Sequence, residues 1–166
     1  MKYVLITLIG ALAAILANKG VAVFNDGLRP IMPEYLEGRM DRKALAAISF
    51  ALSFGLVVGF GIPVSLTGTI ILIHSVLLGT DIIGTWCPDS KVGAVISGVI
   101  GGIYGLGLTL GLKFIVDAFA LLPVNFLPSL GQVSTPIIAA FSVFPALAVA
   151  YQFGFLNGAI TFVISF

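Results

Sequence analysis

Charged residues are scarce in this 166-residue chain. Asp, Glu, Lys and Arg make up 9% of the sequence, whereas soluble domains carry about 25%. The mean hydropathy is +1.17. Because so few charged side chains do not cover the surface of a soluble domain of this length, we interpret the chain as an integral membrane protein in contact with the lipid bilayer. The net charge of +1 excludes the cationic surface that nucleic-acid binding needs.

Cysteine and histidine are also scarce. The single cysteine, Cys87, excludes an internal disulfide and a cysteine-rich metal site, and the single histidine, His74, excludes a histidine cluster. We therefore expect no metal site and no cofactor. An enzyme is the least favoured class, because general acid–base catalysis needs positioned ionisable groups and few lie in the apolar runs.

More than half of the charged residues lie in one stretch, AVFNDGLRPIMPEYLEGRMDRK, at residues 22–43. Lys and Arg collect in cytoplasmic loops beside membrane spans, so one interpretation is a loop that sets topology, with the N-terminus outside. A second interpretation concerns NDGLRP. Asp26 and Arg29 pair if the turn is helical, and the planar fork of Arg29 suits an anionic group. Together with Asn25, these two residues are candidates for binding a substrate or ion.

The apolar runs predict an all-α fold, a polytopic membrane helical bundle with broken or re-entrant segments. About 20 apolar residues cross the bilayer core as a helix, so the uncharged run at 44–73 is too long for one span, and GFGIP at 59–63 offers a break. The first run also permits a signal peptide. The last run is too short to cross, which predicts the N-terminal part of a longer or split transporter. The expected spans are 3–24, 44–62, 69–86, 92–112, 137–152 and, incomplete, 153–166.

Small residues recur every four positions in the run between Lys91 and Lys113. Such a ridge lets two helix backbones approach closely in lipid, so we predict helix packing there. A solute that passes along this smooth face is the alternative. The ridge consists of Gly93, Ser97, Gly98, Gly101, Gly102 and Gly105.

Prolines interrupt the uncharged region LLPVNFLPSLGQVSTP, residues 121–136. Irregular backbone with neutral hydrogen-bonding groups is typical of a re-entrant segment, which survives at membrane depth only where protein or water satisfies it. An ordinary external loop is the alternative. The candidate binding side chains of this segment are Asn125, Ser129, Gln132, Ser134 and Thr135.

Asp81 is a carboxylate within an expected span. Burying it costs several kcal/mol, so it is a candidate for a functional role. His74 precedes it by about two helical turns and shares roughly the same face, so the pair could bind a cation, relay a proton or hold a substrate hydroxyl. Two alternatives remain open: Asp81 caps a helix at the interface, and His74 is a packed or interfacial histidine.

The stretches AVFNDGLRPIMPEYLEGRMDRK, GTDIIGTW and LPVNFLPSLGQVSTPIIAAFSVFPALAVAYQFG resemble the N-terminal part of the YhfT family of bacterial inner-membrane proteins. The resemblance implies a longer protein of about ten spans that transports a small organic compound. It brings no established functional residues. The matching positions are Asn25, Asp26, Gly27, Arg29, Pro30, Glu37, Asp81, Pro123, Gly131, Ser134 and Pro136.

Two classes of function compete. The first is a secondary transporter or permease component that moves a small polar organic solute across the bacterial inner membrane, because transporters bind solutes where broken helices expose backbone groups. Its variant is the membrane channel subunit of a phosphotransferase-type sugar system. The second class is a non-transporting scaffold or assembly subunit that packs through the glycine-rich run. The partners expected are a small-molecule solute and either the remaining spans of the transporter or further copies of the chain.

Overall fold

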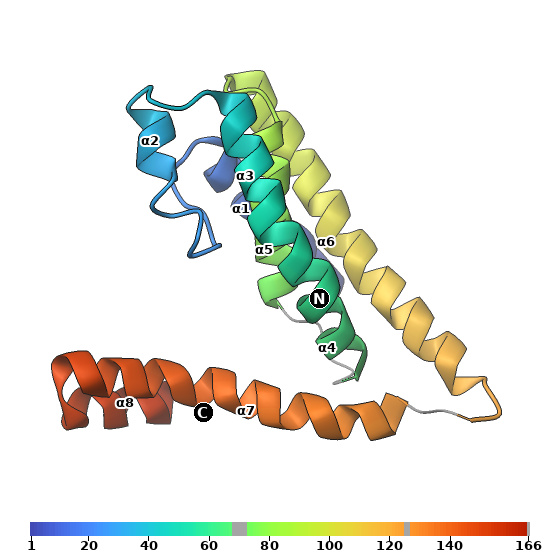
Figure 1. The fold of residues 1–166 in the computed structure, drawn as a ribbon. Helices are drawn as coiled ribbons and strands as arrows, with labels where there is room; N and C mark the ends of the chain where they lie inside the picture. The colour runs from blue at the N-terminus through green and yellow to red at the C-terminus, as the bar shows by residue number, and fades with distance from the viewer. Residues whose placement is uncertain (68–72, 125–126, 166) are drawn as a thin grey trace.

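The structure, a computed structural model, describes residues 1–67, 73–124 and 127–165, and every regular element in these ranges is helical (Figure 1). This confirms the all-α part of the expected fold for the described residues. The elements are α1 (Lys2–Asn18), α2 (Met32–Leu36), α3 (Arg42–Leu56), the π-helical segment η1 (Val57–Gly61), α4 (Ile62–Thr67), α5 (Ile73–Trp86), α6 (Lys91–Ala120), α7 (Leu127–Phe153) and α8 (Phe155–Ser165).

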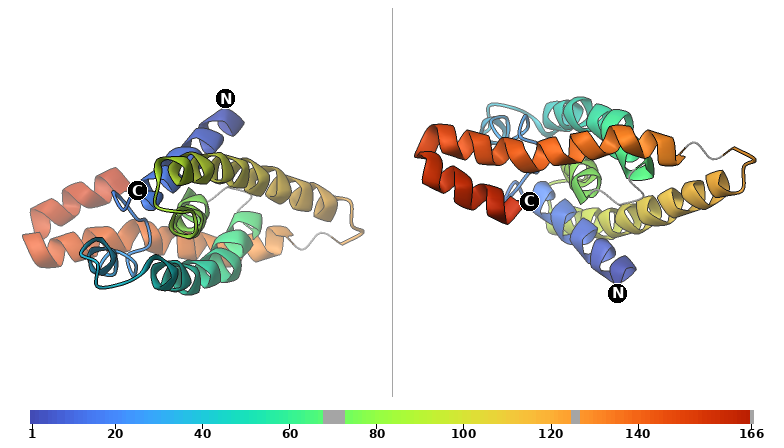
Figure 2. Two further views of the ribbon diagram at one scale, coloured as in Figure 1. Left: turned by 90° about the horizontal axis from the view of Figure 1, so that it is seen from above. Right: turned by 90° about the horizontal axis from the view of Figure 1, so that it is seen from below.

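A bundle of α1, α3 with α4, α5 and α6 forms the larger part of the molecule. Helix α5 contacts α1, α3 and α6, and α6 is the longest helix (Figure 1). Helix α7 runs across one end of this bundle, and α8 folds back along α7 (Figures 1 and 2). The reversal occurs at Gly154, whose φ of 91° lies in the left-handed region that favours glycine.

Helix α1 ends at Asn18, although the apolar run continues to Phe24. Gly20 follows with a φ of 66°, which turns the chain out of the helix. Residues 19–31 then form an irregular segment, which we name the Asn25 loop, and it leads into α2. Within the loop, Leu28 is completely buried in an apolar cluster that also contains Ala17 and Leu45. The loop therefore packs against the bundle.

The helix that begins at Arg42 continues through 59–63, where the sequence suggested a break. Instead of breaking, the backbone widens into the π-helical segment η1. Proline removes one helical hydrogen bond, and its ring crowds the carbonyl four residues earlier, which for Pro63 is that of Gly59. A π-bulge accommodates such a site without ending the helix. The expected span starting at 69 begins in residues 68–72, outside the described residues.

The small-residue ridge of α6 packs against α1, which runs antiparallel to it. A Cβ added to Gly105 would lie 2.9 Å from the carbonyl oxygen of Ile6, and a Cβ on Gly98 would lie 2.8 Å from Ile15 Cδ1. A Cβ on Gly101 would clash with the carbonyl oxygen of Gly10. These contacts require glycine because the two backbones approach closely. All six ridge residues are buried.

Helix α7 begins at Leu127, so most of the segment 121–136 is helical, in place of the irregular backbone that its prolines suggested. Residues 121–124 form an exposed turn, and 125–126 are outside the described residues. Pro128 is compatible with this start because the first helical turn needs no N–H donor. Pro136 and Pro145 lie inside the helix with exposed side chains. Each removes one hydrogen bond, and the other helical hydrogen bonds keep the helix continuous.

Two stretches of helix in the described residues are long and apolar enough to cross a membrane by length and composition, Arg42–Thr67 and Lys91–Ala120. Shorter apolar helices cover Lys2–Asn18, Val143–Phe153 and Phe155–Ile164. Many large apolar side chains on these helices are exposed, among them Leu8, Leu12, Val95, Val99 and Ile103. By composition, these helices are compatible with a membrane environment.

Candidate functional site

Asp81 holds the Asn25 loop. The side chain lies in the middle of α5 and is completely buried. Its carboxylate accepts hydrogen bonds from the backbone N–H groups of Phe24, at 3.0 and 2.9 Å, and of Asn25, at 2.7 Å. Asp81 therefore does not cap its own helix. Instead it satisfies two N–H groups of an irregular segment that has no helical partners for them.

Asn25 extends this contact to a third element. Its side chain is buried, its Nδ2 donates to Ser53 Oγ of α3 at 3.1 Å, and its Oδ1 accepts from the Gly27 N–H at 2.9 Å. The second bond is an Asx turn, which fixes the loop locally. Asp81, Asn25 and Ser53 thus join α5, the loop and α3 in one buried hydrogen-bonded chain.

Further contacts follow the interface between α3 and α5 on both sides of this hydrogen-bonded chain. At one end, Trp86 Nε1 donates to the Ala46 carbonyl at 3.1 Å. At the other end, a Cβ on Gly61 would lie 3.1 Å from Ser75 Cβ. These pairs show that α3–η1 and α5 run antiparallel in one register. We name the buried residues Ser49, Ser53, Gly61, Ser75 and Asp81 the polar stripe.

Two hydroxyls of the polar stripe have no hydrogen-bond partner among the described residues. These are Ser49 Oγ and Ser75 Oγ, on residues that are 0% and 1% exposed. An unsatisfied buried hydroxyl costs about 1–3 kcal/mol. Natural interiors satisfy nearly all such groups, so these two hydroxyls are exceptions within the α3–α5 interface.

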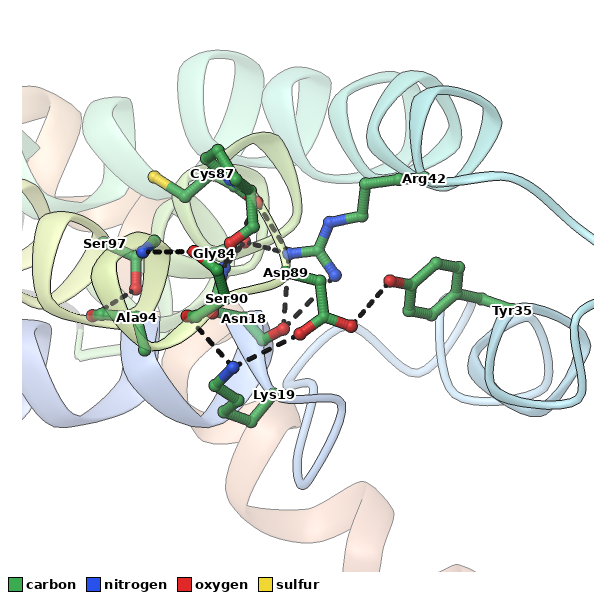
Figure 3. Close-up of polar contacts among 12 residues, drawn as sticks. Asn18, Lys19, Tyr35, Arg42, Gly84, Cys87, Asp89, Ser90, Ala94 and Ser97 are labelled. Atoms are coloured by element: carbon green, nitrogen blue, oxygen red, sulfur yellow. Dashed lines mark hydrogen bonds and ion pairs between the residues drawn. The ribbon is translucent and has the colours of Figure 1, made fainter.

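A second polar cluster joins the ends of three helices (Figure 3). The Arg42 guanidinium, at the start of α3, donates to the carbonyls of Asn18 at 3.2 Å, Gly84 at 2.7 Å and Cys87 at 2.9 Å. The Asn18 amide donates to the same Gly84 and Cys87 carbonyls. Carbonyls at helix C-termini lack helical partners and carry partial negative charge, so a guanidinium is a favourable cap for α1 and α5.

The outer part of this cluster centres on Asp89. Its carboxylate accepts from the Tyr35 hydroxyl at 2.8 Å and from Lys19 Nζ at 3.2 Å (Figure 3). These two hydrogen bonds hold the pKa of Asp89 below its usual value. Asp89 thus connects the turn between α5 and α6 to α2 and to the end of α1.

The structure places the other predicted site residues apart from Asp81. Arg29 Nε forms the expected pair with Asp26 Oδ1 at 3.3 Å, and both side chains are exposed. His74 is exposed at the start of α5, so it does not join the buried Asp81. Ser129 and Gln132 are exposed on α7. Asn125 lies outside the described residues, as do the side chains of Ser134 and Thr135.

Sequence reasoning missed the partners of these groups. Ser53 was not singled out, although Ser49 and Ser53 lie one helical turn apart in an apolar helix, which is a recognisable signal. For Arg42, the sequence indicates only a contribution to the excess of Lys and Arg that sets membrane topology. No pattern around it indicates which carbonyls it binds, because they belong to other helices. In the ranges that the structure describes, no group of three or more His, Cys, Asp or Glu side chains could hold a metal ion.

Comparison with known proteins places the chain among relatives without an assigned function. The family model YhfT, described as a protein of unknown function, matches residues 2–166. The "Uncharacterized protein YhfT" of Escherichia coli (strain K12) is 33% identical over 164 residues, which is 99% of this chain and 37% of that protein. The chain thus spans well under half of that relative. No solved structure matches. On the family match and this identity, the chain belongs to the YhfT family.

Proposed function

We propose that the chain is part of a secondary transporter that moves a small polar organic solute across the bacterial inner membrane. The observation that carries this proposal is the completely buried Asp81 carboxylate, which binds the backbone of the Asn25 loop inside an apolar bundle. A carboxylate in this setting is costly and marks solute or ion pathways in membrane proteins. Irregular backbone that a helix bundle satisfies is also how transporters build their binding sites.

A membrane location is the first part of the proposal. It is supported by two stretches of helix long and apolar enough to cross and by the many exposed apolar side chains of the bundle. Apart from Asp81 and the Asp26–Arg29 pair on the loop that Asp81 binds, the charges agree with a spanning bundle because they gather at its two ends. Lys19, Arg42 and Asp89 lie at one end, whereas Lys113 and Asp117 pair near the other end of α6. The positive bias makes the first end cytoplasmic and leaves the N-terminus outside.

The polar stripe is the second part of the proposal. It offers a buried carboxylate and two hydroxyls without partners along one helix interface. Movement of the Asn25 loop would expose Asp81, because the loop covers the carboxylate through its own N–H groups. In the proposed cycle, the arrangement with the loop bound to Asp81 is the closed one, and release of the loop gives the open one that alternating access requires.

Uptake by proteoliposomes that contain the complete transporter, with this chain as part of it, tests the proposal. We expect a panel of labelled small polar metabolites, offered with and without a proton or sodium gradient, to include at least one that accumulates. Asp81→Asn should reduce that uptake at least tenfold, while Asp117→Asn, which changes an exposed carboxylate at the end of α6, should leave it unchanged. Equal uptake by empty liposomes, or by Asp81→Asn, would contradict transport by this site.

A non-transporting scaffold is the second candidate, and one observation favours it. A groove of about 390 Å³ lies along the α1–α6 contact, lined by small and apolar residues that include Ala11, Gly98 and Gly102. A further transmembrane helix fits such a groove by close packing. The scaffold predicts that Asp81→Asn is tolerated, while Val99→Trp, which obstructs the groove from an exposed position, prevents association with other membrane subunits in cross-linking experiments.

A further inference from the structure

An open pocket of about 400 Å³ lies between the start of the Asn25 loop and α2. Its volume is in the range of small-molecule binding sites, about 300–1,000 Å³. The walls are mainly apolar and come from the loop and α2, with Val23 and Met32 buried beneath the surface. The residues that line the pocket include Gly20, Val21, Val23, Arg29, Met32 and Leu36.

Gly20 allows the loop to pack directly against α2 at this side of the pocket. It has a φ of 66°, and a Cβ at this position would lie 3.0 Å from Leu36 Cδ2 and 3.3 Å from Met32 Sδ. The loop and α2 therefore meet at the glycine with no room for a side chain. The left-handed conformation of Gly20 therefore shapes this side of the pocket.

Arg29 supplies the only charge among the pocket residues. Its ion pair uses Nε and the 90%-exposed Asp26, an arrangement that contributes little because water screens both groups. Arg39, which follows α2, differs because Glu34 and Glu37 accept hydrogen bonds from its Nε and from both of its terminal nitrogens. Exchange of Asp26 for another anion therefore breaks one contact at Arg29, whereas exchange at Arg39 breaks three.

The pocket is connected to the polar stripe through the loop itself. Arg29 is in the turn whose N–H groups bond the Asn25 carbonyl, and Asn25 is held by Asp81. An anion bound to Arg29 therefore acts on the same loop that covers Asp81.

We propose that this pocket binds an organic anion, a carboxylate or phosphate that carries a short apolar group, with Arg29 on the anionic group and the apolar wall on the remainder. A guanidinium binds such oxyanions through two parallel hydrogen bonds. The proposal rests on the proposed function only in taking this anion as the transported solute. The headgroup of an anionic lipid has the same chemistry and is the other source of the ligand.

Calorimetric titration of the purified chain in neutral detergent tests binding without transport. Hexanoate and hexyl phosphate should bind, whereas hexan-1-ol and hexylamine should bind at least tenfold more weakly. Arg29→Gln should weaken hexanoate binding at least tenfold, and Arg29→Lys should lose less than Arg29→Gln. The matched control Arg39→Gln should bind as the unchanged chain does. Leu36→Glu, which places a carboxylate in the pocket wall, should also abolish binding.

Nanodiscs distinguish the two sources of the anion. A free organic anion should bind equally in phosphatidylcholine and in phosphatidylglycerol nanodiscs, whereas a lipid headgroup in the pocket should make phosphatidylglycerol compete with hexanoate. Equal binding in both nanodiscs and competition by phosphatidylglycerol each support the anion site, provided that Arg29→Gln removes the binding or the competition. The proposal is overturned if neither probe binds in any medium, or if Arg29→Gln and Leu36→Glu both bind as the unchanged chain does. Anion binding without uptake would contradict the transport proposal and leave the anion site supported.

Discussion

At the scale of single residues, several of the few charged side chains form hydrogen bonds with backbone N–H and carbonyl groups that have no helical partner. Asp81 binds two N–H groups of the Asn25 loop, and Arg42 binds carbonyls at the ends of α1 and α5. Neither makes an ion pair with a described residue. Hydrogen bonds to a charged group are stronger than neutral ones, about 1.5–3 kcal/mol each, so single charged side chains hold irregular segments and helix ends in place.

Asp81→Asn should release the Asn25 loop without unfolding the bundle. The amide has one oxygen to accept from the Phe24 and Asn25 N–H groups, and its own NH₂ group opposes them. A loss of about 2 kcal/mol corresponds to about 30-fold faster hydrogen exchange at these two amides. Hydrogen-exchange mass spectrometry measures this rate. Asp26→Asn, on the same loop but exposed, should exchange at these amides like the unchanged chain, and unchanged protection in Asp81→Asn would contradict the role of Asp81.

The lowered pKa of Asp89 predicts that the stability of the folded chain depends on pH. Because its pKa is lowered in the folded state, its contribution is present above the pKa of the unfolded chain, about 3.9, and is lost as the pH falls through the lower folded value. Asp89→Asn should reduce the Tm by about 1–3 °C at pH 7, as expected for an exposed pair. Thermal unfolding in detergent over a series of pH values from 7 to 2.5 measures both. A Tm difference that does not decrease as the pH falls would contradict this assignment.

At the scale of elements, packing decides where helices end and meet. The α1–α6 contact depends on glycines at the points of closest approach, and η1 allows the helix from Arg42 to continue past Pro63. In α7, two prolines lie inside a helix that the sequence pattern predicted to be broken. Proline removes single hydrogen bonds, so a long helix with exposed prolines survives where a short one would not.

A pair of substitutions on α6 tests the packing of this helix. Gly101→Ala should destabilise the chain by about 1–3 kcal/mol because the methyl group meets α1. Gly107→Ala, on the same helix with nothing within 4 Å of an added Cβ, should be neutral or stabilise by up to about 1 kcal/mol. Thermal unfolding in detergent compares the two variants. Equal Tm values would show that the ridge does not contact α1 closely.

At the scale of the whole molecule, charge is separated between the two ends of the bundle. Lys19, Arg42 and Asp89 join the helix ends on one side, while Lys113 and Asp117 lie near the other end of α6. The space between them is filled with apolar helices whose outer side chains are exposed, with the buried Asp81 as the exception inside the bundle. This distribution suits a bilayer, with one charged layer at each surface.

The proposed orientation predicts which positions a reagent outside the cell reaches. In a Cys87→Ser background, Lys2→Cys should react with a membrane-impermeant maleimide in intact cells. Lys91→Cys, exposed at the start of α6, should react only after the cells are opened, because it lies at the proposed cytoplasmic end. Gel-shift analysis of the labelled protein reads both results. The reverse pattern would place the N-terminus inside, and reaction of both positions in intact cells would contradict a spanning bundle.

The sequence by itself determined the helical content, the close packing along the α6 ridge and the Asp26–Arg29 pair. These depend on composition and on spacings of three or four residues, which one helix or turn converts directly into geometry. It also marked Asp81 as unusual, because a carboxylate in an apolar run is visible without a structure.

Only the tertiary structure decided what Asp81, Ser53 and Arg42 bind, and that α7 continues through its prolines. The partners of Asp81 and Arg42 are backbone groups, which carry no signature in a sequence, and they come from segments far along the chain. Which N–H or carbonyl remains unsatisfied depends on where each helix ends, and that follows from packing between helices and not from the pattern of any one of them.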